Sequence, residues 1–205
     1  RVERGCRLVV SVPHGSKTVL QMPRGNIEVI HPRSLSIVLL ADHLDAGNMK
    51  EAFMLARTQR INLNLLVDHD MNRFVASIIE VVEQISRPDY LTIFIADLLD
   101  EDVCTTLYAD QYKSKESKHP VSRDKVSRVC TVLRTELEKK DAKKYLLPIL
   151  ATYVRDGKNL EQALAVIKSY KDVGVKNLVD DGLRFLATMV DINALFNVAL
   201  GTYDL

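Results

Sequence analysis

The stretch Gly25-Asn-Ile-Glu-Val-Ile-His-Pro-Arg-Ser-Leu-Ser-Ile-Val-Leu-Leu-Ala-Asp-His-Leu44 divides this 205-residue chain into two kinds of pattern. Short alternating runs bounded by turn residues come before it, and long runs with helical apolar spacing follow it. The ring of Pro32 fixes φ near the helical value and supplies no N–H that a first helical turn would leave unpaired. The residue before a proline is biased towards an extended conformation. The stretch therefore predicts that a strand ends at His31 and that a helix begins at Pro32.

Three strands are predicted before this junction, over residues 7–12, 17–22 and 26–30. The first two runs are rich in β-branched and apolar residues, the third alternates, and turn residues separate the runs at 13–16 and 23–25. Consecutive short strands joined by tight turns form a meander, which is the local pattern of one β-propeller blade. We expect residues 1–31 to be the terminal strands of a propeller.

Only helices are predicted after the junction, since apolar residues recur there at i, i+3, i+4 and i+7. The expected helices begin near residues 33, 48, 70, 88, 122, 141, 159, 178 and 192. The predicted N-caps include Asp70 and Ser122, and Asn159 with Gln162 is expected to form a capping box. Pro148 should kink its helix or delay the start of that helix. Residues 108–122 show no apolar periodicity and are expected to form a long loop.

Two segments of the helical part resemble each other. The run Leu40–Gly47 followed by Glu51-Ala-Phe53 is similar to Leu150–Gly157 followed by Gln162-Ala-Leu164. Each copy reads as a helix, a glycine stop and a second helix, which is the design of tetratricopeptide-like repeats. The predicted fold is therefore mainly α. Residues 32–205 are expected to form an irregular α-solenoid of helical hairpins rather than a compact bundle.

The composition is that of an ordinary globular protein. Apolar residues make up 47% of the chain and charged residues 27%, and the net charge is +1. This balance gives no global attraction to nucleic acid or membrane. The three cysteines are irregularly spaced, so a reduced cytoplasmic or nuclear setting is expected. The chain begins with Arg1 and enters strand-like sequence within a few positions, so we expect it to be a segment of a longer protein.

Four polar clusters are candidate sites. Asp68-His69-Asp70 is rich in metal ligands, but one N-capping turn explains it better. The acidic run from Asp97 to Asp102 lacks the spacing of a calcium loop and reads as a solvated helix end. The basic segment 113–128 holds six basic and two acidic residues, which permits a phosphate contact to RNA or a solvated loop. The fourth cluster, which reads mostly as solvated charge, is Lys139, Lys140, Lys143 and Lys144.

Catalysis is not expected. Cys104 and Cys130 lie in apolar-periodic contexts, where core packing is the default role of a thiol. The sequence contains no Walker A, GxGxxG, HExxH or GxSxG motif. We therefore assign no catalytic, cofactor-binding or metal-binding residue and no cofactor, and we expect the chain not to be an enzyme.

Several blocks carry a family resemblance over nearly the whole chain. The specific ones are Leu20–Arg33 and Arg60–His69, supported by Lys50-Glu-Ala-Phe53 and Leu200–Leu205. They resemble the largest, scaffold subunits of the Elongator complex, the IKAP family. The resemblance implies the end of a second WD40 propeller followed by the start of a solenoid.

The resemblance also implies a function. The family scaffolds a complex that modifies tRNA wobble uridines with 5-carboxymethyl-type groups. The implied partners are a second WD40 subunit and a radical-SAM, acetyltransferase-like catalytic subunit, with homodimerisation and tRNA contact outside this segment. No membrane is implied. The alternatives are a propeller-plus-solenoid subunit of a vesicle coat or nuclear pore, which would use the same fold, and an independent RNA-binding helical module.

Overall fold

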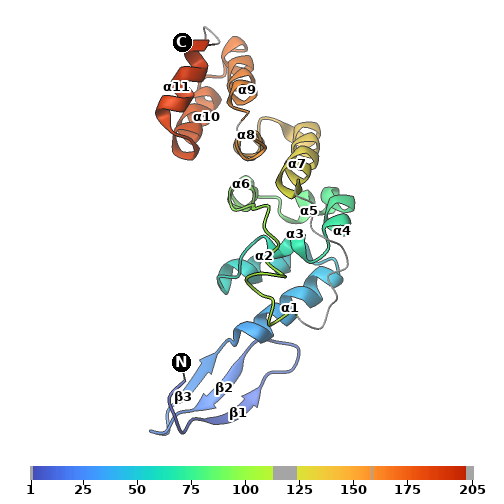
Figure 1. Ribbon diagram of the computed structural model, residues 1–205, viewed down its shortest axis with the longest axis vertical. Coiled ribbons are helices and arrows are strands. Elements are labelled where there is room, and N and C mark those ends of the chain that lie inside the picture. Colours follow the sequence, from blue (N-terminus) through green and yellow to red (C-terminus); the bar gives the residue numbers. More distant parts are fainter. Residues whose placement is uncertain (1, 113–123, 158, 202–205) are drawn as a thin grey trace. The chain divides into compact units, whose positions relative to one another are not determined.

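The computed structural model describes residues 2–112, 124–157 and 159–201. Within these residues it contains three strands and eleven helices (Figure 1). The described residues fall into two compact units. Unit 1 contains the residues up to Asp70 and the segment that begins at Asp102; unit 2 contains Met71–Glu101 and the described residues from Asp124 on. The prediction of a mainly helical chain that opens with short strands is confirmed.

The strands of unit 1 form one antiparallel sheet in the order β1-β2-β3. They span β1 (Arg7–Ser11), β2 (Thr18–Gln21) and β3 (Ile27–Ile30), each within the range that the sequence predicts. Arg7 pairs with Gln21, and Thr18 pairs with Ile30. At the second turn Gly25 has φ +90°, which a residue without a side chain adopts at little cost. The predicted meander is confirmed, and its membership of a propeller stays a prediction.

The first helical hairpin follows at once. Helix α1 (Arg33–Asp45) is joined to α2 (Met49–Thr58) through Gly47, which has φ +77°. Pro32 has φ −56° and ψ 131°, so it is the last extended residue rather than the first helical one, and α1 begins at Arg33. A hydrogen bond also links the start of α1 to the residues that follow α2. The Arg33 guanidinium donates to the backbone carbonyl of Arg60 at 2.8 Å.

A short third helix, α3 (Leu65–Asp68), packs against α2 and is not predicted from the sequence. Its four residues are too few to show a helical period. Leu65, Leu66 and Val67 are all buried, so an apolar run inside a connection between longer helices is the signal that was missed.

Unit 2 is helical throughout its described part. Its helices are α4 (Met71–Ala76), α5 (Ile78–Gln84), α6 (Pro88–Ala96), α7 (Lys125–Asp141), α8 (Leu146–Arg155), α9 (Leu160–Asp172), α10 (Lys176–Met189) and α11 (Ile192–Gly201). Successive neighbours pack on one another, as in α7 with α8, α8 with α9 and α9 with α10. In addition, α8 contacts both α6 and α10. It is therefore the central helix of this unit.

Two helix boundaries differ from the predictions. The single helix expected from Asp70 to Ile85 is broken at Ser77, where φ is −100° and ψ is 24°. The Ser77 hydroxyl and the Ser77 backbone N–H both donate to the Arg73 carbonyl at 2.9 Å, a side-chain bond of the kind that bends helices. The predicted capping box is also wrong, because the Asn159 amide donates to the Asp156 carbonyl at 2.9 Å and makes no cap bond to α9.

Other boundaries follow the predicted signals. Pro88 is in the first turn of α6. Helix α8 begins at Leu146, so Pro148 lies in its first turn and the predicted delay is confirmed. The predicted cap Ser122 and residues 113–122 of the predicted loop lie outside the described residues, and α7 begins after Asp124. The predicted domain division between residues 31 and 32 stays a prediction.

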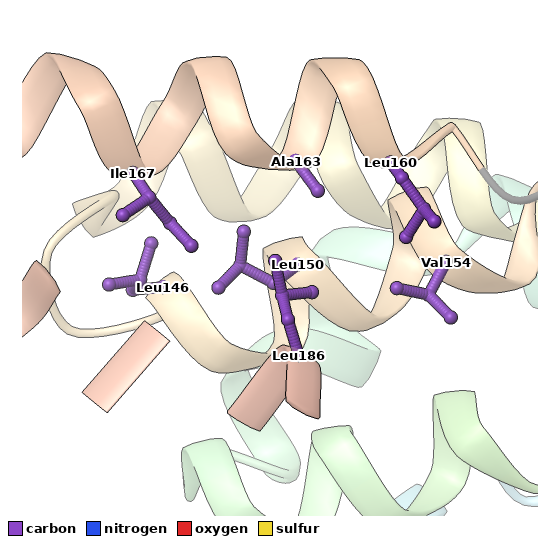
Figure 2. Packing of buried hydrophobic residues seen from close by; sticks show 7 residues of the cluster. All are labelled: Leu146, Leu150, Val154, Leu160, Ala163, Ile167 and Leu186. Atoms are coloured by element: carbon purple, nitrogen blue, oxygen red, sulfur yellow. The ribbon is translucent and has the colours of Figure 1, made fainter. Parts of the chain in front are cut away.

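The core between α8, α9 and α10 shows why these helices pair (Figure 2). Leu160, Ala163 and Ile167 point from α9 towards α8, and Leu186 of α10 points towards Leu150. The α8 side of this cluster consists of Leu146, Leu150 and Val154. The loop between α8 and α9 turns at Gly157, with φ +76°, as the α1–α2 loop turns at Gly47. The internal repeat predicted from the sequence is therefore present as two helical hairpins.

Candidate functional site

The ligand-rich residues Asp68, His69 and Asp70 do not converge. The Asp68 carboxylate accepts the Val103 N–H at 2.9 Å. The His69 ring lies between Asp45 and Tyr112, with Nε2 2.8 Å from the Asp45 carboxylate and Nδ1 2.7 Å from the Tyr112 hydroxyl. Asp70 precedes α4 directly. In the described part of the chain, no group of three His, Cys, Asp or Glu residues has the geometry to hold a metal ion.

His69 links Asp45 and Tyr112 through two side-chain hydrogen bonds. Burial raises the pKa of the Tyr112 phenol, and the nearby Cys104 and Asp45 raise it further. The phenol therefore stays protonated at neutral pH, and the ring N–H at Nε2 of His69 donates to the Asp45 carboxylate. A protonated tyrosine at the end of such a chain is not a nucleophile. The arrangement joins the end of α1, the end of α3 and the segment from Asp102 within unit 1.

A second tyrosine anchors the same segment. Tyr108 is 6% exposed, and its hydroxyl accepts the backbone N–H of Asn62 at 2.8 Å. Tyr108 therefore satisfies a donor in the connection between α2 and α3, 46 residues away in the chain. Sequence periodicity gives no signal for either tyrosine, because both lie in turns rather than on a helical face.

The acidic run is solvated as predicted, since Asp97, Asp100 and Glu101 are exposed, and Asp100 in addition contacts the start of the next helix. Asp100 Oδ1 accepts the Val126 N–H at 3.0 Å, in the first turn of α7. Asp102 Oδ1 accepts the Cys104 N–H at 2.9 Å. The solvated helix end is therefore confirmed, and these two carboxylates also satisfy backbone donors that would otherwise be unpaired.

Lys125 corrects the reading of the basic segment 113–128. Its side chain is fully buried at 0% exposed, and its ammonium donates to the Glu101 carbonyl at 2.7 Å. A lysine in this position cannot meet a phosphate in solvent. Arg128 is exposed on α7. The remaining basic residues of the segment, Lys113, Lys115, Lys118 and Arg123, lie outside the described residues.

Arg134 is the polar centre of the α7–α8 contact. Its guanidinium donates to Thr152 Oγ1 at 2.9 Å and to Asp156 Oδ2 at 3.0 Å. The same group lies 3.9 Å from the centroid of the Tyr153 ring. The Arg134 and Asp156 side chains are only 14% and 16% exposed. Sequence reasoning missed this residue, because its partners follow 18 to 22 positions later.

The lysine cluster is exposed as predicted. Lys139, Lys140, Lys143 and Lys144 all have exposed side chains. Rather than covering one face of a helix, they occupy the last turn of α7 and the turn that leads into α8.

The cysteines are free thiols. Cys6 is partly exposed, whereas Cys104 in unit 1 and Cys130 in unit 2 are buried. Burial raises the pKa of the Cys130 thiol to about 12, and Asp156 contributes in the same direction. The thiolate is the nucleophilic form, so Cys130 is poorly suited to covalent catalysis. Its expected role in core packing is supported.

Cys130 is expected to resist alkylation in the folded chain. Because its pKa is raised, the thiol stays protonated at pH 9, where an unfolded cysteine is substantially ionised. The stability that this group contributes is thus present below pH 9 and is lost as the pH rises towards 12. Iodoacetamide labelling followed by mass spectrometry at pH 8–9 should modify Cys6 first. Labelling of Cys130 as fast as Cys6 in folded protein would contradict this placement.

No helix in the described ranges is long and apolar enough to cross a membrane.

Taken together, the helical hairpins, their glycine turns and a set of polar residues used for capping and anchoring define a segment of the α-solenoid class. The family model described as ELP1 alpha-solenoid matches residues 33–205, so its first matched residue is the first residue of α1. The chain belongs to the ELP1 alpha-solenoid family.

Curated relatives agree over the whole chain. Elongator complex protein 1 of Drosophila melanogaster is 38% identical over 206 residues, which cover 99% of this chain and 16% of that protein. Putative elongator complex protein 1 of Xenopus laevis is 38% identical over 208 residues, or 100% of this chain and 18% of that protein. The Schizosaccharomyces pombe protein is 35% identical over 206 residues, with 100% and 16% covered. The chain thus spans 16 to 18% of the length of these relatives, and the predicted family is confirmed.

Proposed function

We propose that this chain is a non-catalytic scaffold segment of the Elongator complex. In this role it supports modification of tRNA wobble uridines by 5-carboxymethyl-type groups, and it does so by holding partner subunits. The observation that carries the proposal is the match of the ELP1 alpha-solenoid family to residues 33–205, together with relatives named Elongator complex protein 1 along the whole chain. Fold alone would not select this function.

The mechanism is geometric. Each helical hairpin buries its apolar face against its neighbours, so a rigid unit forms without any cofactor. The polar residues that the sequence offers for chemistry are engaged in this construction: Asp100 caps α7, Lys125 is buried against Glu101, and Arg134 joins α7 to α8. What remains at the surface of unit 2 is available for binding other molecules.

The proposed partners are those that the family resemblance implies. They are a second WD40 subunit and a radical-SAM, acetyltransferase-like catalytic subunit, with homodimerisation through parts of the protein outside these residues. Transfer RNA is reached mainly through the complex. We place the protein in the cytoplasm, with the nucleus as a second location. The rival function, a subunit of a vesicle coat or nuclear pore, is not favoured by these relatives.

Affinity capture of the full-length protein from cells tests the proposal. We expect the radical-SAM subunit to copurify, and we expect depletion of the protein to lower the 5-carboxymethyl-type modification of wobble uridines, measured by mass spectrometry of purified tRNA. Re-expression of the natural protein should restore the modification. Recovery of vesicle-coat subunits without the radical-SAM subunit, or normal modification after depletion, would refute it.

A further inference from the structure

Within the described residues, the chain crosses between the two units at two places. It passes from unit 1 to unit 2 at the Asp70–Met71 peptide bond, and it returns to unit 1 at Glu101–Asp102. A third crossing, at His119–Pro120, lies outside the described residues. The first crossing lies directly before α4, and the second lies in the turns that follow α6. Residues at the ends of elements are those that absorb the backbone torsion changes of hinge motions.

One hydrogen bond joins the two crossings. The Asp68 carboxylate accepts the Val103 N–H at 2.9 Å, although the two residues are 35 positions apart. Asp68 is two positions before Asp70, and Val103 directly follows Asp102. A residue spans at most about 3.6 Å of chain, so both crossings must lie close to this bond. A carboxylate that accepts an N–H forms a charge-assisted hydrogen bond, which is stronger than a neutral one.

On the side of unit 1, the chain is held up to both crossings. The His69 side chain, 7% exposed, bonds to the Asp45 carboxylate at 2.8 Å and to the Tyr112 hydroxyl at 2.7 Å. After the second crossing, the Asp102 carboxylate accepts the Cys104 N–H at 2.9 Å. Unit 1 therefore fixes the residue before Asp70 and the residues from Asp102 on.

On the side of unit 2, the chain is held equally close to both crossings. The buried Lys125 ammonium donates to the Glu101 carbonyl at 2.7 Å, and Asp100 Oδ1 accepts the Val126 N–H at 3.0 Å. At the other crossing, Met71 is itself the first residue of α4. The fixed parts of the two units are therefore separated by Asp70 at one crossing and by the single Glu101–Asp102 link at the other.

We propose that Asp70 and the Glu101–Asp102 link form a two-strand hinge between the units, with Asp68 as its pin. Two covalent links held side by side allow bending about the line that joins them and oppose twisting. The Asp68–Val103 bond keeps the links together, so it sets how far the units can twist. The hinge depends on bonds within each unit and requires no particular partner.

The test measures distances in the full-length protein by double electron–electron resonance, with spin labels attached to introduced noncanonical residues. One pair joins the units, at Glu51 on α2 and Arg184 on α10, and a second pair lies within unit 2, at Arg128 on α7 and Arg184. All three positions are exposed. In the natural protein, the distribution between the units should be broader than the one within unit 2.

Asp68→Ala should broaden the distribution between the units further and leave the one within unit 2 unchanged. The Val103 N–H should then exchange with solvent deuterium about 10- to 100-fold faster, as for loss of a hydrogen bond to a charged group. The matched control is Asp141→Ala. That carboxylate also accepts a backbone N–H, from Lys143 at 3.1 Å, but it lies wholly within unit 2. It should change neither distribution.

Three results would overturn the proposal. Equal widths for the two label pairs in the natural protein would refute the hinge. Faster exchange at Val103 without a broader distribution between the units would show that Asp68 is not the pin. Equal broadening by Asp141→Ala would identify general destabilisation as the cause. Should Asp68→Ala fail to fold, Asp68→Asn keeps a neutral acceptor oxygen and should broaden the same distribution to a smaller extent; an unchanged width would again refute the pin.

Discussion

Replacing Gly182 by valine is expected to destabilise the α8–α9–α10 core by about 1–3 kcal/mol, the range for overpacking a close-packed interior. A Cβ on Gly182 would lie 3.1 Å from Ile167 Cδ1 and 3.3 Å from Leu150 Cδ1, closer than ordinary van der Waals contact. Glycine in a helix interior costs roughly 1 kcal/mol relative to alanine. Glycine is nevertheless suited to position 182, because α10 approaches α8 and α9 too closely for a branched side chain.

The two buried thiols allow the effect to be located. Cys130 lies in unit 2 and Cys104 in unit 1, so pulsed thiol labelling in dilute urea reports the opening of each unit separately. Gly182→Val should raise the labelling rate of Cys130 and leave that of Cys104 unchanged.

Two comparisons separate overpacking from helix propensity. Arg184→Val places the same β-branched residue at an exposed position of the same helix and should change little. Shortening the facing side chain by Ile167→Ala should make the double variant with Gly182→Val less unstable than the sum of the two single changes. Additive effects, or equal effects of the two valines, would show that the close approach is not the cause.

The elements that the sequence predicts correctly are those specified by nearby residues. Gly47 and Gly157 end helices through their own positive φ, and Pro88 begins α6 through its own ring. The apolar periods of α7 and α9 extend over several turns, so their burial follows from the pattern alone. Local chemistry of this kind requires no knowledge of the partner.

The wrong predictions share a different property, since each depends on a competing or distant bond. Ser77 interrupts a continuous apolar period, and its hydroxyl adds a bond to the Arg73 carbonyl, which also accepts the Ser77 backbone N–H. Asn159 has the residue type and spacing of a cap, but its amide bonds backwards to Asp156. Lys125 is predicted to be loop charge because its partner is distant: its ammonium donates a hydrogen bond to the backbone carbonyl of Glu101, 24 positions earlier.

Replacing Arg134 by alanine is expected to destabilise unit 2 by about 3 kcal/mol, as for removal of one partner from a buried ion pair. The change removes the bonds to Thr152 and Asp156 and the contact with the Tyr153 ring. It also leaves the Asp156 carboxylate, which is 16% exposed, without its guanidinium. Lysine at this position keeps the charge but not the planar guanidinium, so the stability of Arg134→Lys should lie between that of the natural protein and that of Arg134→Ala. Cys130, one helical turn away on α7, provides the labelling reporter.

The chain supplies a matched control for this prediction. Arg87 also pairs with an aspartate, at 2.7 Å from Asp89, and also lies over a tyrosine, at 4.4 Å from the Tyr90 centroid. Its side chain is 63% exposed, so Arg87→Ala should leave stability unchanged within error. Adding Asp156→Ala to Arg134→Ala should recover part of the loss, because no carboxylate is then left buried and unpaired.

These variants connect the packing of α7 on α8 to the proposed scaffold role. If the solenoid acts by holding subunits at a fixed separation, Arg134→Ala in the full-length protein should reduce both the recovery of the radical-SAM subunit and the modification of wobble uridines, whereas Arg87→Ala should change neither. Because the Arg134 side chain is only 14% exposed and bonds to groups at the end of α8, a loss of both readouts would point to the geometry of the hairpin. A variant that is destabilised to the predicted extent yet retains full subunit recovery and full modification would show that assembly does not depend on this hairpin.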